Sequence, residues 1–595
     1  LGSRPEGWAA VTLLLFATAV VLLFPASLMP WSLFPGSPEF SSQAHSANYH
    51  WLIHKEGLFG AVNSDLLLYP VQVNWLTKLG FPLDAIISYP FTLLFGWPAG
   101  YALFILASLW LGGVSMAWLA GRWWRSKAAA IIAGVTLQCS CLISWELNSG
   151  NVANIFGVIF IPLSIGYFCL AVSGQRWRPA LKAGACCGLA MLSFWFFGFF
   201  LAVALGILLV AAVIEGRTFF KPCLGFALGA LIVAGLPAWY TLDYLEKVPG
   251  INLGPWDMFS RLGQEMPLAK WIAGENLVLQ AQDPMGLRTV HVVVTTLLFI
   301  GVIGVRPRRW VTPAAWAAMG LVLALGPWVP LPGGTTLPGP YLALLNVPLL
   351  GRLWYPYQML FLVAPAVALL AGGGGARLER LLARGRRLLS SEQEGEPPRW
   401  VPRWSSRLAP LVGPLAAGAV LAEAFWSVPT LPLAATSAKP SSKAAFLAQE
   451  EGPLLLLPFH RGNGQQASGM FIDQISHGRS LVNGRAFPFE TLAPVEYRLS
   501  PIWPVVGFLA GCEQDATAEY SGPEDPLGKL KEIGLSQITV DLAALEGIPA
   551  RTQKTYFSCI ESLFGKRYKT KSGFRLYPVG GKLSADNASG EEAPR

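Results

Sequence analysis

Apolar runs long enough to cross a membrane recur along most of this chain, and the connections between them alternate in charge. Every second connection carries arginine and lysine, whereas the others are longer and mixed in charge. Hydrophobic residues make up 53% of the sequence and charged residues 13%, about half of the charged fraction of ordinary soluble domains. The pattern predicts an α-helical polytopic membrane protein, embedded in the lipid bilayer.

Eleven apolar runs are expected to form the spans. They lie at residues 8–28, 99–121, 128–145, 152–173, 183–198, 200–215, 222–241, 290–305, 311–328, 356–373 and 408–427. The fifth and sixth runs form either one long kinked element or a tight pair of helices. The first run is expected to be a true span, because no small-residue cleavage pattern follows it.

The basic connections fall on a single side of the membrane if eleven spans are correct. They lie at residues 122–127, 176–182, 217–221, 306–309 and 376–407. The positive-inside rule makes this side cytoplasmic, so the chain is expected to be N-in and C-out. We interpret the formal charge of +9 as this orientation signal and not as nucleic-acid binding.

The opposite side receives the large polar pieces. Within a transmembrane domain of residues 1–435, the outer loops are 29–98, 242–289 and 329–355. The first loop contains SSQAHSANYHWLIHKEG, which predicts an amphipathic helix on the membrane surface, and DAIISYPFTLLFGWP, an apolar run too short to span. This second segment is expected to dip back into the protein.

The tail of the chain has the composition of a small α/β domain, expected over residues 436–580. GPLLLLPF, QITVDL, KRYKT and FRLYPV predict strands, whereas ASGMFIDQISHG, DPLGKLKEIG and TQKTYFSCIESLFG predict helices. Residues 581–595 are polar and rich in small residues, which predicts a disordered tail.

Two tail cysteines, Cys512 and Cys559, lie on the side expected to be oxidising, so they are disulfide candidates, with free thiols as the alternative. The other six cysteines fall within apolar runs and are expected to be packing residues.

Nucleotide-binding, zinc-protease and nucleophile-elbow motifs are absent from the sequence, so candidate chemistry rests on the first outer loop. This loop contains three of the six histidines: His45, His50 and His54. His50 and His54 share a helix face and could bind a divalent metal or relay protons. Alternatively they bridge apolar and wet surroundings, since a third metal ligand is not evident nearby.

Two acidic residues of the same loop are candidate general bases, Glu39 and Asp65. A carboxylate at a dry interface can have its pKa raised and accept a proton from a hydroxyl nucleophile. The alternatives are a solvated loop charge for Glu39 and a turn or helix-capping role for Asp65.

The segment LLGRLWYPYQMLFL places Arg352 and Tyr355 where the third outer loop enters a span. Arginine at that depth could bind a lipid phosphate through charge-assisted hydrogen bonds. The alternative is an arginine that snorkels beside an aromatic belt.

The chain resembles the bacterial C-type membrane glycosyltransferases (GT-C), in particular uncharacterised envelope proteins with a periplasmic C-terminal domain. The resemblance rests on SDLLLYPVQVN, SYPFTLLFGWPAGYALF, GGVSMAWLAGRWWRSKAAAIIAGV, LNSGNVANIFGVIFIPLSI and GRLWYPYQMLFLVAPAVALLAGGG, and in the tail on LLLLPFHRGNGQQASGMFIDQISHGRSLVNG. It implies a bacterial inner membrane protein that transfers a sugar from a polyprenyl-phosphate carrier at the periplasmic face. The base would then be Glu39, or Asp65, and the cation near the donor phosphate Arg352.

Three polar positions depart from the family pattern. Serines stand where an aspartate is expected before His45, the NSGN motif lacks a following carboxylate, and Gln358 stands where a second arginine is often found. These departures leave two function classes open beside each other: a glycosyltransferase, and a catalytically degenerate scaffold subunit whose outer domain docks membrane-protein partners. A lipid or solute transporter is a third reading, which the scarcity of charges in the spans disfavours.

Overall fold

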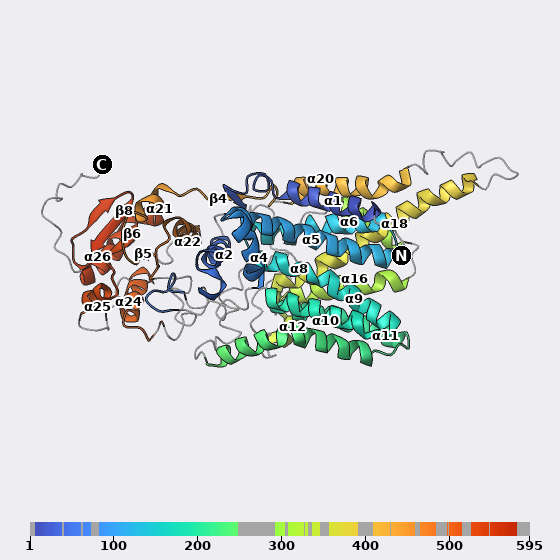
Figure 1. Ribbon diagram of the computed structural model, residues 1–595, viewed down its shortest axis with the longest axis horizontal. Coiled ribbons are helices and arrows are strands. Elements are labelled where there is room, and N and C mark those ends of the chain that lie inside the picture. Colours follow the sequence, from blue (N-terminus) through green and yellow to red (C-terminus); the bar gives the residue numbers. More distant parts are fainter. Residues whose placement is uncertain are drawn as a thin grey trace. The chain divides into compact units, whose positions relative to one another are not determined.

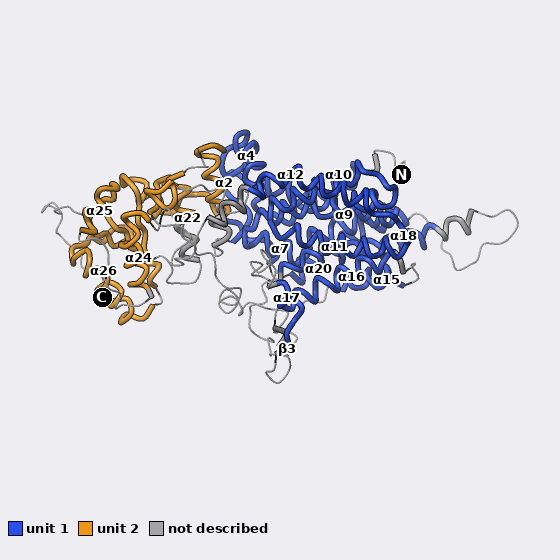
Figure 2. The backbone as a smooth tube through the Cα atoms, turned by 90° about the horizontal axis from the view of Figure 1, so that it is seen from below, with its two compact units in different colours: residues 1–37, 80–243, 253–436 blue, residues 38–79, 244–252, 437–595 orange. Residues whose placement is uncertain are grey.

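We analysed a computed structural model of the chain (Figure 1). It describes residues 6–37, 41–60, 64–72, 83–247, 292–303, 307–326, 328–330, 336–345, 356–390, 408–428, 430–458, 465–482, 497, 499–514, 520, 525–546 and 548–579. The chain divides into two compact units, coloured in Figure 2. Unit 1 comprises residues 1–37, 80–243 and 253–436, and unit 2 comprises residues 38–79, 244–252 and 437–595.

Unit 1 is a bundle of helices that run side by side (Figure 1). Its longer helices are α1 (Glu6–Leu22), α4 (Leu83–Phe95), α5 (Ala99–Trp124), α6 (Lys127–Gln138), α7 (Cys141–Ser149), α8 (Val152–Val158), α9 (Phe160–Gly174), α10 (Trp177–Ser193), α11 (Phe196–Ile214), α12 (Phe220–Lys247), α15 (Val292–Val302), α16 (Pro307–Ala324), α18 (Leu360–Ser390) and α20 (Val412–Ser427). Short elements complete it: β1 (Leu33–Pro35), β2 (Trp328–Pro330), β3 (Thr336–Pro338), α17 (Tyr341–Leu345), η3 (Pro356–Met359), η4 (Ala409–Leu411) and β4 (Ala435–Ser437).

Each of the eleven predicted apolar runs overlaps a helix of this bundle. Among the described residues, six helices are long and apolar enough to cross a membrane, and α6 with α7, bent by 41°, form a seventh candidate span. The chain is therefore a multi-pass membrane protein, while the count of eleven spans stays a prediction. The tight-pair alternative for residues 183–215 is the observed one, because the helix breaks between Ser193 and Phe196.

Two helices extend beyond their predicted ends. α18 continues to Ser390, so the first part of the predicted basic connection 376–407 is helical. α12 continues to Lys247, into the predicted outer loop 242–289. In both, good helix formers such as leucine, lysine and arginine follow the apolar run, so the backbone continues as a helix after the hydrophobic pattern stops.

Within the described residues, hydrogen bonds join the basic connections of unit 1 in two pairs. The Trp123 indole N–H, at the end of α5, donates a hydrogen bond to the Arg309 carbonyl at the start of α16, 2.9 Å away. Likewise, Arg217 after α11 donates to the Ser173 hydroxyl at the end of α9 over 3.2 Å. These contacts join connections far apart in sequence, as the charge pattern predicts.

The opposite end of the bundle is fixed by backbone groups and one carboxylate. Glu423 in α20 accepts the N–H groups of Val293 and Val294, at 2.7 and 3.3 Å, which stabilises the N-terminus of α15. The N–H of Gly36 donates to the carbonyl of Ala434 over 2.9 Å, beside the two-stranded pairing of β1 with β4.

Helix α18 lies within this bundle and packs through four consecutive glycines, residues 372–375. A Cβ on Gly372, Gly374 or Gly375 would lie less than 3 Å from an atom of α6 or α15, and one on Gly373 would meet the ring of Trp124. Small residues let helix backbones approach closely in a membrane, where helix association depends on packing contacts. Gly374 makes the closest of these approaches, with a Cβ position 2.1 Å from the Leu297 carbonyl oxygen.

Unit 2 is an α/β structure. It contains α2 (Ser41–Gly60), α21 (Ser442–Leu447), β5 (Leu455–Leu457), α22 (Gln465–His477), α24 (Trp503–Gln514), α25 (Pro526–Glu532), β6 (Gln537–Asp541), η5 (Ala543–Leu545), α26 (Ala550–Phe564), β7 (Lys569–Lys571) and β8 (Phe574–Pro578). The four strands lie in the order β5-β6-β8-β7, with β5 parallel to β6 and the other two pairs antiparallel.

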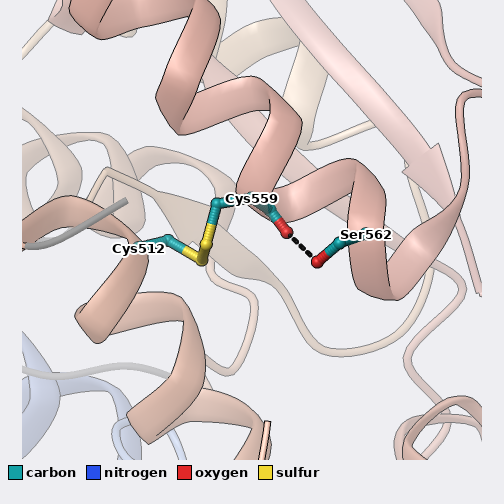
Figure 3. Close-up of a disulfide and its surroundings, with 3 residues drawn as sticks. All are labelled: Cys512, Cys559 and Ser562. Carbon is teal, nitrogen blue, oxygen red and sulfur yellow. Dashed lines mark hydrogen bonds between the residues drawn. A yellow bond between two sulfur atoms is a disulfide. The ribbon is translucent and has the colours of Figure 1, made fainter. Parts of the chain in front are cut away.

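The sheet of unit 2 is covered on both faces. Phe574 stacks on Phe446 of α21, with ring centroids 5.8 Å apart, whereas the next residue, Arg575, lies on Phe557 of α26. Successive residues of a strand point to opposite faces, so α21 and α26 cover opposite sides. A disulfide joins Cys512 of α24 to Cys559 of α26, with Cα atoms 5.7 Å apart (Figure 3).

The first outer loop contributes to unit 2, which the sequence did not indicate. Helix α2 packs on α22, and the N–H of Leu481 donates to the carbonyl of Leu66 over 2.8 Å. The predicted surface helix forms, but its placement on a membrane surface is wrong, because Asn48, His50 and Leu52 are all buried around its axis. An interfacial helix would keep its polar side chains in water.

Candidate functional site

The break between α7 and α8 holds a buried carboxylate, Glu146, at the end of unit 1 that lies away from the basic connections. The side chain of Ser140 caps the start of α7 by accepting the N–H of Ile143. Gly150 ends α7 in the left-handed conformation, with φ of 75°, which glycine adopts without steric cost. Asn151 then precedes α8, and its N–H donates to the Glu146 carbonyl over 2.9 Å.

Glu146 is completely buried, with 0% of its surface exposed. Its Oε2 accepts a hydrogen bond of 2.9 Å from the side-chain amide of Asn154, in the first turn of α8. Its Oε1 is buried and forms no hydrogen bond of standard geometry within the described ranges, although the side chain of Asn151 also interacts with the carboxylate. A buried polar atom without a regular hydrogen bond needs an explanation, and an ionisable residue inside a membrane bundle is by default a candidate functional group.

The same break contacts the start of the first outer loop. The N–H of Ser37 donates to the carbonyl of Asn148, two residues after Glu146, over 2.7 Å. Helix α4, in the last part of this loop, packs against α8 and carries the buried Asp84 in its first turn. The arrangement offers a carboxylate oxygen that could accept a proton or a hydrogen bond from a bound hydroxyl group.

The sequence analysis missed Glu146, because it lies in CLISWELNSG next to the predicted span 128–145. A signal was available: Glu146 is a charged residue that directly follows a predicted membrane run and stands between Trp145 and Leu147. Its pairing with Asn154, by contrast, depends on the turn geometry at Gly150.

The predicted site residues that the structure describes all lie in unit 2. Glu39, Arg352 and Tyr355 lie outside the described residues. His45 lies in the first turns of α2, and the partly exposed Asp65 lies in unit 2 within electrostatic range of Lys55. The roles predicted for these five residues therefore remain proposals.

The remaining predicted histidines lie in α2 of unit 2, where His50 is 1% exposed. Burial lowers the pKa of His54 below its ordinary value. Among the described residues, no three histidine, cysteine, aspartate or glutamate side chains are grouped closely enough to hold a metal ion.

Gln474, on α22, connects the first outer loop to the tail. It is fully buried, accepts from the Asn48 amide over 2.8 Å, and donates to the carbonyls of Leu66 and Arg479 at 2.6 and 3.0 Å. Beside it, the Nδ1 atom of His477 accepts the N–H of Arg479 over 3.1 Å. This network holds residues more than 400 positions apart in one structure.

Acid is expected to destabilise unit 2 through His477. Burial, followed by the nearby charges of Arg479 and Lys55, lowers the pKa of His477 to about 3. Between about pH 6.5 and 3 the unfolded histidine binds a proton that the folded one excludes, so stability is complete above pH 6.5 and falls as the pH drops. We expect the wild type to lose about 1 to 2 kcal/mol between pH 7 and pH 5 from this group alone.

The measurement is thermal unfolding at both pH values for the wild type and His477→Asn, which keeps a hydrogen-bond acceptor and removes the titration. The raised pKa values of Asp473 and Glu56 act in the opposite direction and are present in both proteins. Equal pH slopes for the two proteins would show that His477 does not carry the effect.

Among the comparisons with known proteins, similarity is found with solved structures and not with protein families or curated sequences. No protein-family model matches the sequence, and no curated protein matches it. ArnT from Cupriavidus metallidurans bound to undecaprenyl phosphate is a similar solved structure, with 14% identity, a TM-score of 0.50, and coverage of 96% of this chain and 97% of that one. The apo form of that ArnT gives 14% identity, a TM-score of 0.49 and 96% coverage of each chain.

The archaeal oligosaccharyltransferase AglB from Archaeoglobus fulgidus, in complex with an inhibitory peptide and a dolichol-phosphate, gives 12% identity and a TM-score of 0.44, with coverage of 97% of this chain and 75% of that one. At these identities the likeness concerns the fold alone. The chain has a GT-C-like fold, as its sequence motifs predicted.

Proposed function

We propose that this protein transfers a sugar from a polyprenyl-phosphate donor to an acceptor at the outer face of the bacterial inner membrane. The observation that carries the proposal is the GT-C-like fold together with Glu146, a buried carboxylate at the end of the bundle opposite the basic connections. The proposal follows the positive-inside rule, which makes the basic end of the bundle cytoplasmic and unit 2 periplasmic.

In the proposed reaction, an acceptor hydroxyl attacks the anomeric carbon of the donor sugar. A new carbon–oxygen bond forms, the bond from that carbon to the phosphate oxygen breaks, and the electron pair leaves with the polyprenyl phosphate. Glu39, or Asp65, takes the hydroxyl proton as general base, a contribution of typically about 10²- to 10⁴-fold. Arg352 stabilises the negative charge on the departing phosphate, with Tyr355 beside it.

Glu146 enters the proposal as a positioning residue. Its Oε1 could accept a hydrogen bond from the acceptor or from a side chain of the outer loop, while Asn154 holds Oε2 in place. The histidines at positions 45, 50 and 54 would then act by supporting the first outer loop and not by contact with the reacting atoms.

The experiment is a transfer assay on purified protein in liposomes, with a panel of undecaprenyl-phosphate sugars and extracted envelope acceptors. We expect Glu39→Gln to lower the rate at least about 100-fold without changing the melting temperature. Glu546→Gln, at an exposed position of unit 2, is the matched control and should keep the wild-type rate.

Wild-type rates in Glu39→Gln would remove Glu39 from the mechanism, and a loss in Asp65→Asn would assign its role to Asp65. Absence of transfer with every donor, together with stable co-purification of other membrane proteins, would contradict the enzyme and favour the scaffold class.

A further inference from the structure

Strand β7, at one edge of the sheet in unit 2, carries an unusual density of positive charge. Residues 566–571 read KRYKTK, with four cations and one tyrosine. Because the strand order is β5-β6-β8-β7, β7 is paired on one side only among the strands that the structure describes. Lys566, Arg567 and Lys571 are exposed, and Lys569 is partly exposed.

The charges of unit 2 are segregated along the sequence. Residues 551–575 contain seven basic residues and one acidic residue, whereas residues 513–546 contain eight acidic and two basic residues. Within the described part of the chain, Lys554, Lys566, Arg567 and Lys569 form no ion pair. Clustered like charges oppose folding through mutual repulsion, so an uncompensated cluster suggests an external anionic partner.

An ordered aromatic stack lies within this cluster. The guanidinium carbon of Arg575 is 3.7 Å from the ring centroid of Phe557 and 4.2 Å from that of Tyr568, and Glu561 lies 3.8 Å from its Nη1. Tyr568 remains 40% exposed. The stack holds the Tyr568 ring in one orientation, because cation–π contacts on Arg575 fix its position.

The position of α26 in this stack is fixed by the disulfide. Cys559 lies two residues after Phe557 and is bonded to Cys512 of α24, while the Ser562 hydroxyl donates to the Cys559 carbonyl over 2.7 Å (Figure 3). Helix α26 thus presents Lys554 and Phe557, one turn apart, on a covalently fixed element.

Two simpler explanations account for less of the surface. Lysines often protect edge strands from pairing with other chains, but the cluster also extends to α26 and includes a positioned tyrosine. Binding to a bilayer surface requires apolar side chains that enter the headgroup region. Among the described residues from 551 to 575, Tyr568 is the only large apolar side chain that is strongly exposed.

We propose that Tyr568 and the cations at positions 554, 566 and 567, here named the basic edge, bind a saccharide chain that carries phosphate or carboxylate groups. A sugar ring presents an apolar face of C–H groups, which packs on an aromatic ring, while the cations neutralise the anionic substituents. The basic edge binds such a chain whether or not unit 1 transfers sugars. If it does, the bound chain is a suitable acceptor.

The test measures binding of fluorescent alginate oligosaccharides, which are polymers of sugar acids, to the full-length protein in detergent. Neutral dextran, inorganic polyphosphate and vesicles with anionic lipids serve as comparison probes. We expect alginate to bind and neutral dextran not to bind. Lys566→Gln with Arg567→Gln should weaken alginate binding about 10-fold or more, whereas Lys529→Gln with Lys531→Gln, on α25 of the same unit, should change it less than about 2-fold.

The tyrosine separates sugar recognition from simple charge attraction. Tyr568→Ala should weaken alginate binding about 5-fold while leaving polyphosphate binding within about 2-fold, and Tyr568→Phe should retain both, since it keeps the ring. The melting temperatures of Tyr568→Ala and Tyr568→Phe show whether unit 2 stays folded when the contact of residue 568 with Arg575 is changed. Equal losses for alginate and polyphosphate, stronger binding to anionic vesicles than to alginate, or absence of alginate binding would each overturn the proposal. None of these readouts depends on transfer activity.

Discussion

Replacing Gly374 by alanine is expected to prevent the assembly of unit 1. The added Cβ would lie 2.1 Å from the carbonyl oxygen of Leu297 in α15, a backbone atom that no side-chain rotation can move away. Overpacking a core commonly costs about 1 to 3 kcal/mol, and a clash with the backbone of a neighbouring helix belongs at or above that upper limit. We expect a loss of most monodisperse protein in size-exclusion chromatography and a lower melting temperature for what remains.

The matched control is Gly206→Ala in α11, where a Cβ would meet no atom within 4 Å. Alanine favours a helix over glycine by about 1 kcal/mol, so this variant should be as stable as the wild type or slightly more stable. If both variants gave wild-type yield, the close approach of α18 to α15 would be contradicted.

Replacing Arg479 by methionine is expected to open the part of unit 2 around β5. The guanidinium group donates to four backbone carbonyls, those of residues 447, 451, 452 and 453, at distances of 3.0, 2.8, 2.8 and 3.2 Å. These carbonyls lie between α21 and β5, so one side chain joins the end of a helix to the approach of a strand. Hydrogen bonds to charged groups each contribute about 1.5 to 3 kcal/mol, and partial exposure reduces the total, so we expect a loss of about 3 kcal/mol.

The measurement is amide hydrogen exchange of peptides that cover residues 454–457 and 537–541, because β5 pairs with β6 through these backbone groups. Both peptides should exchange faster in Arg479→Met by about two orders of magnitude, which corresponds to the expected loss. Arg551→Met, at an exposed position on α26, should leave their exchange unchanged. Faster exchange in both variants would point to a general effect of removing a positive charge.

The helices of unit 1 and the strands of the tail could be predicted because their signals are local. Apolar runs define the membrane helices. A short apolar run between two prolines predicts β5, alternating residues predict β6, and the pair KRYKT and FRLYPV on either side of a glycine predicts β7 and β8. The helices α21 and α24 were missed, since SKAAFL is shorter than the helix patterns that can be recognised and PIWPVVGFLAGCE contains two prolines, at positions 501 and 504. The interfacial placement of α2 was wrong for a different reason. Its sequence matches an exposed helix, and in the folded chain α22 provides a surface that buries it.

The candidate site, like the fold, was predicted from the sequence only in part. The prediction that any chemistry lies on the side away from the basic connections came from composition, and the hydrogen bond of Ser37 with Asn148 lies at that end of unit 1. The environment of the Glu146 carboxylate depends on the direction of the chain between α7 and α8, which the left-handed conformation of Gly150 sets. Composition and hydrophobic pattern do not reveal this direction.

By itself, the sequence determined that the chain is a multi-pass membrane protein and where the helices of unit 1 lie, and it predicted that the basic connections share one side. These properties depend on hydrophobicity and charge summed over neighbouring residues, and water and lipid act on them before any tertiary contact forms. Only the tertiary structure decided that residues 38–79 join the tail in unit 2, that Asn154 holds one oxygen of Glu146, and that Arg575 orders Tyr568 at the basic edge. Each of these depends on which side chains the packing brings within a few ångströms of one another, and that distance is a property of the folded chain.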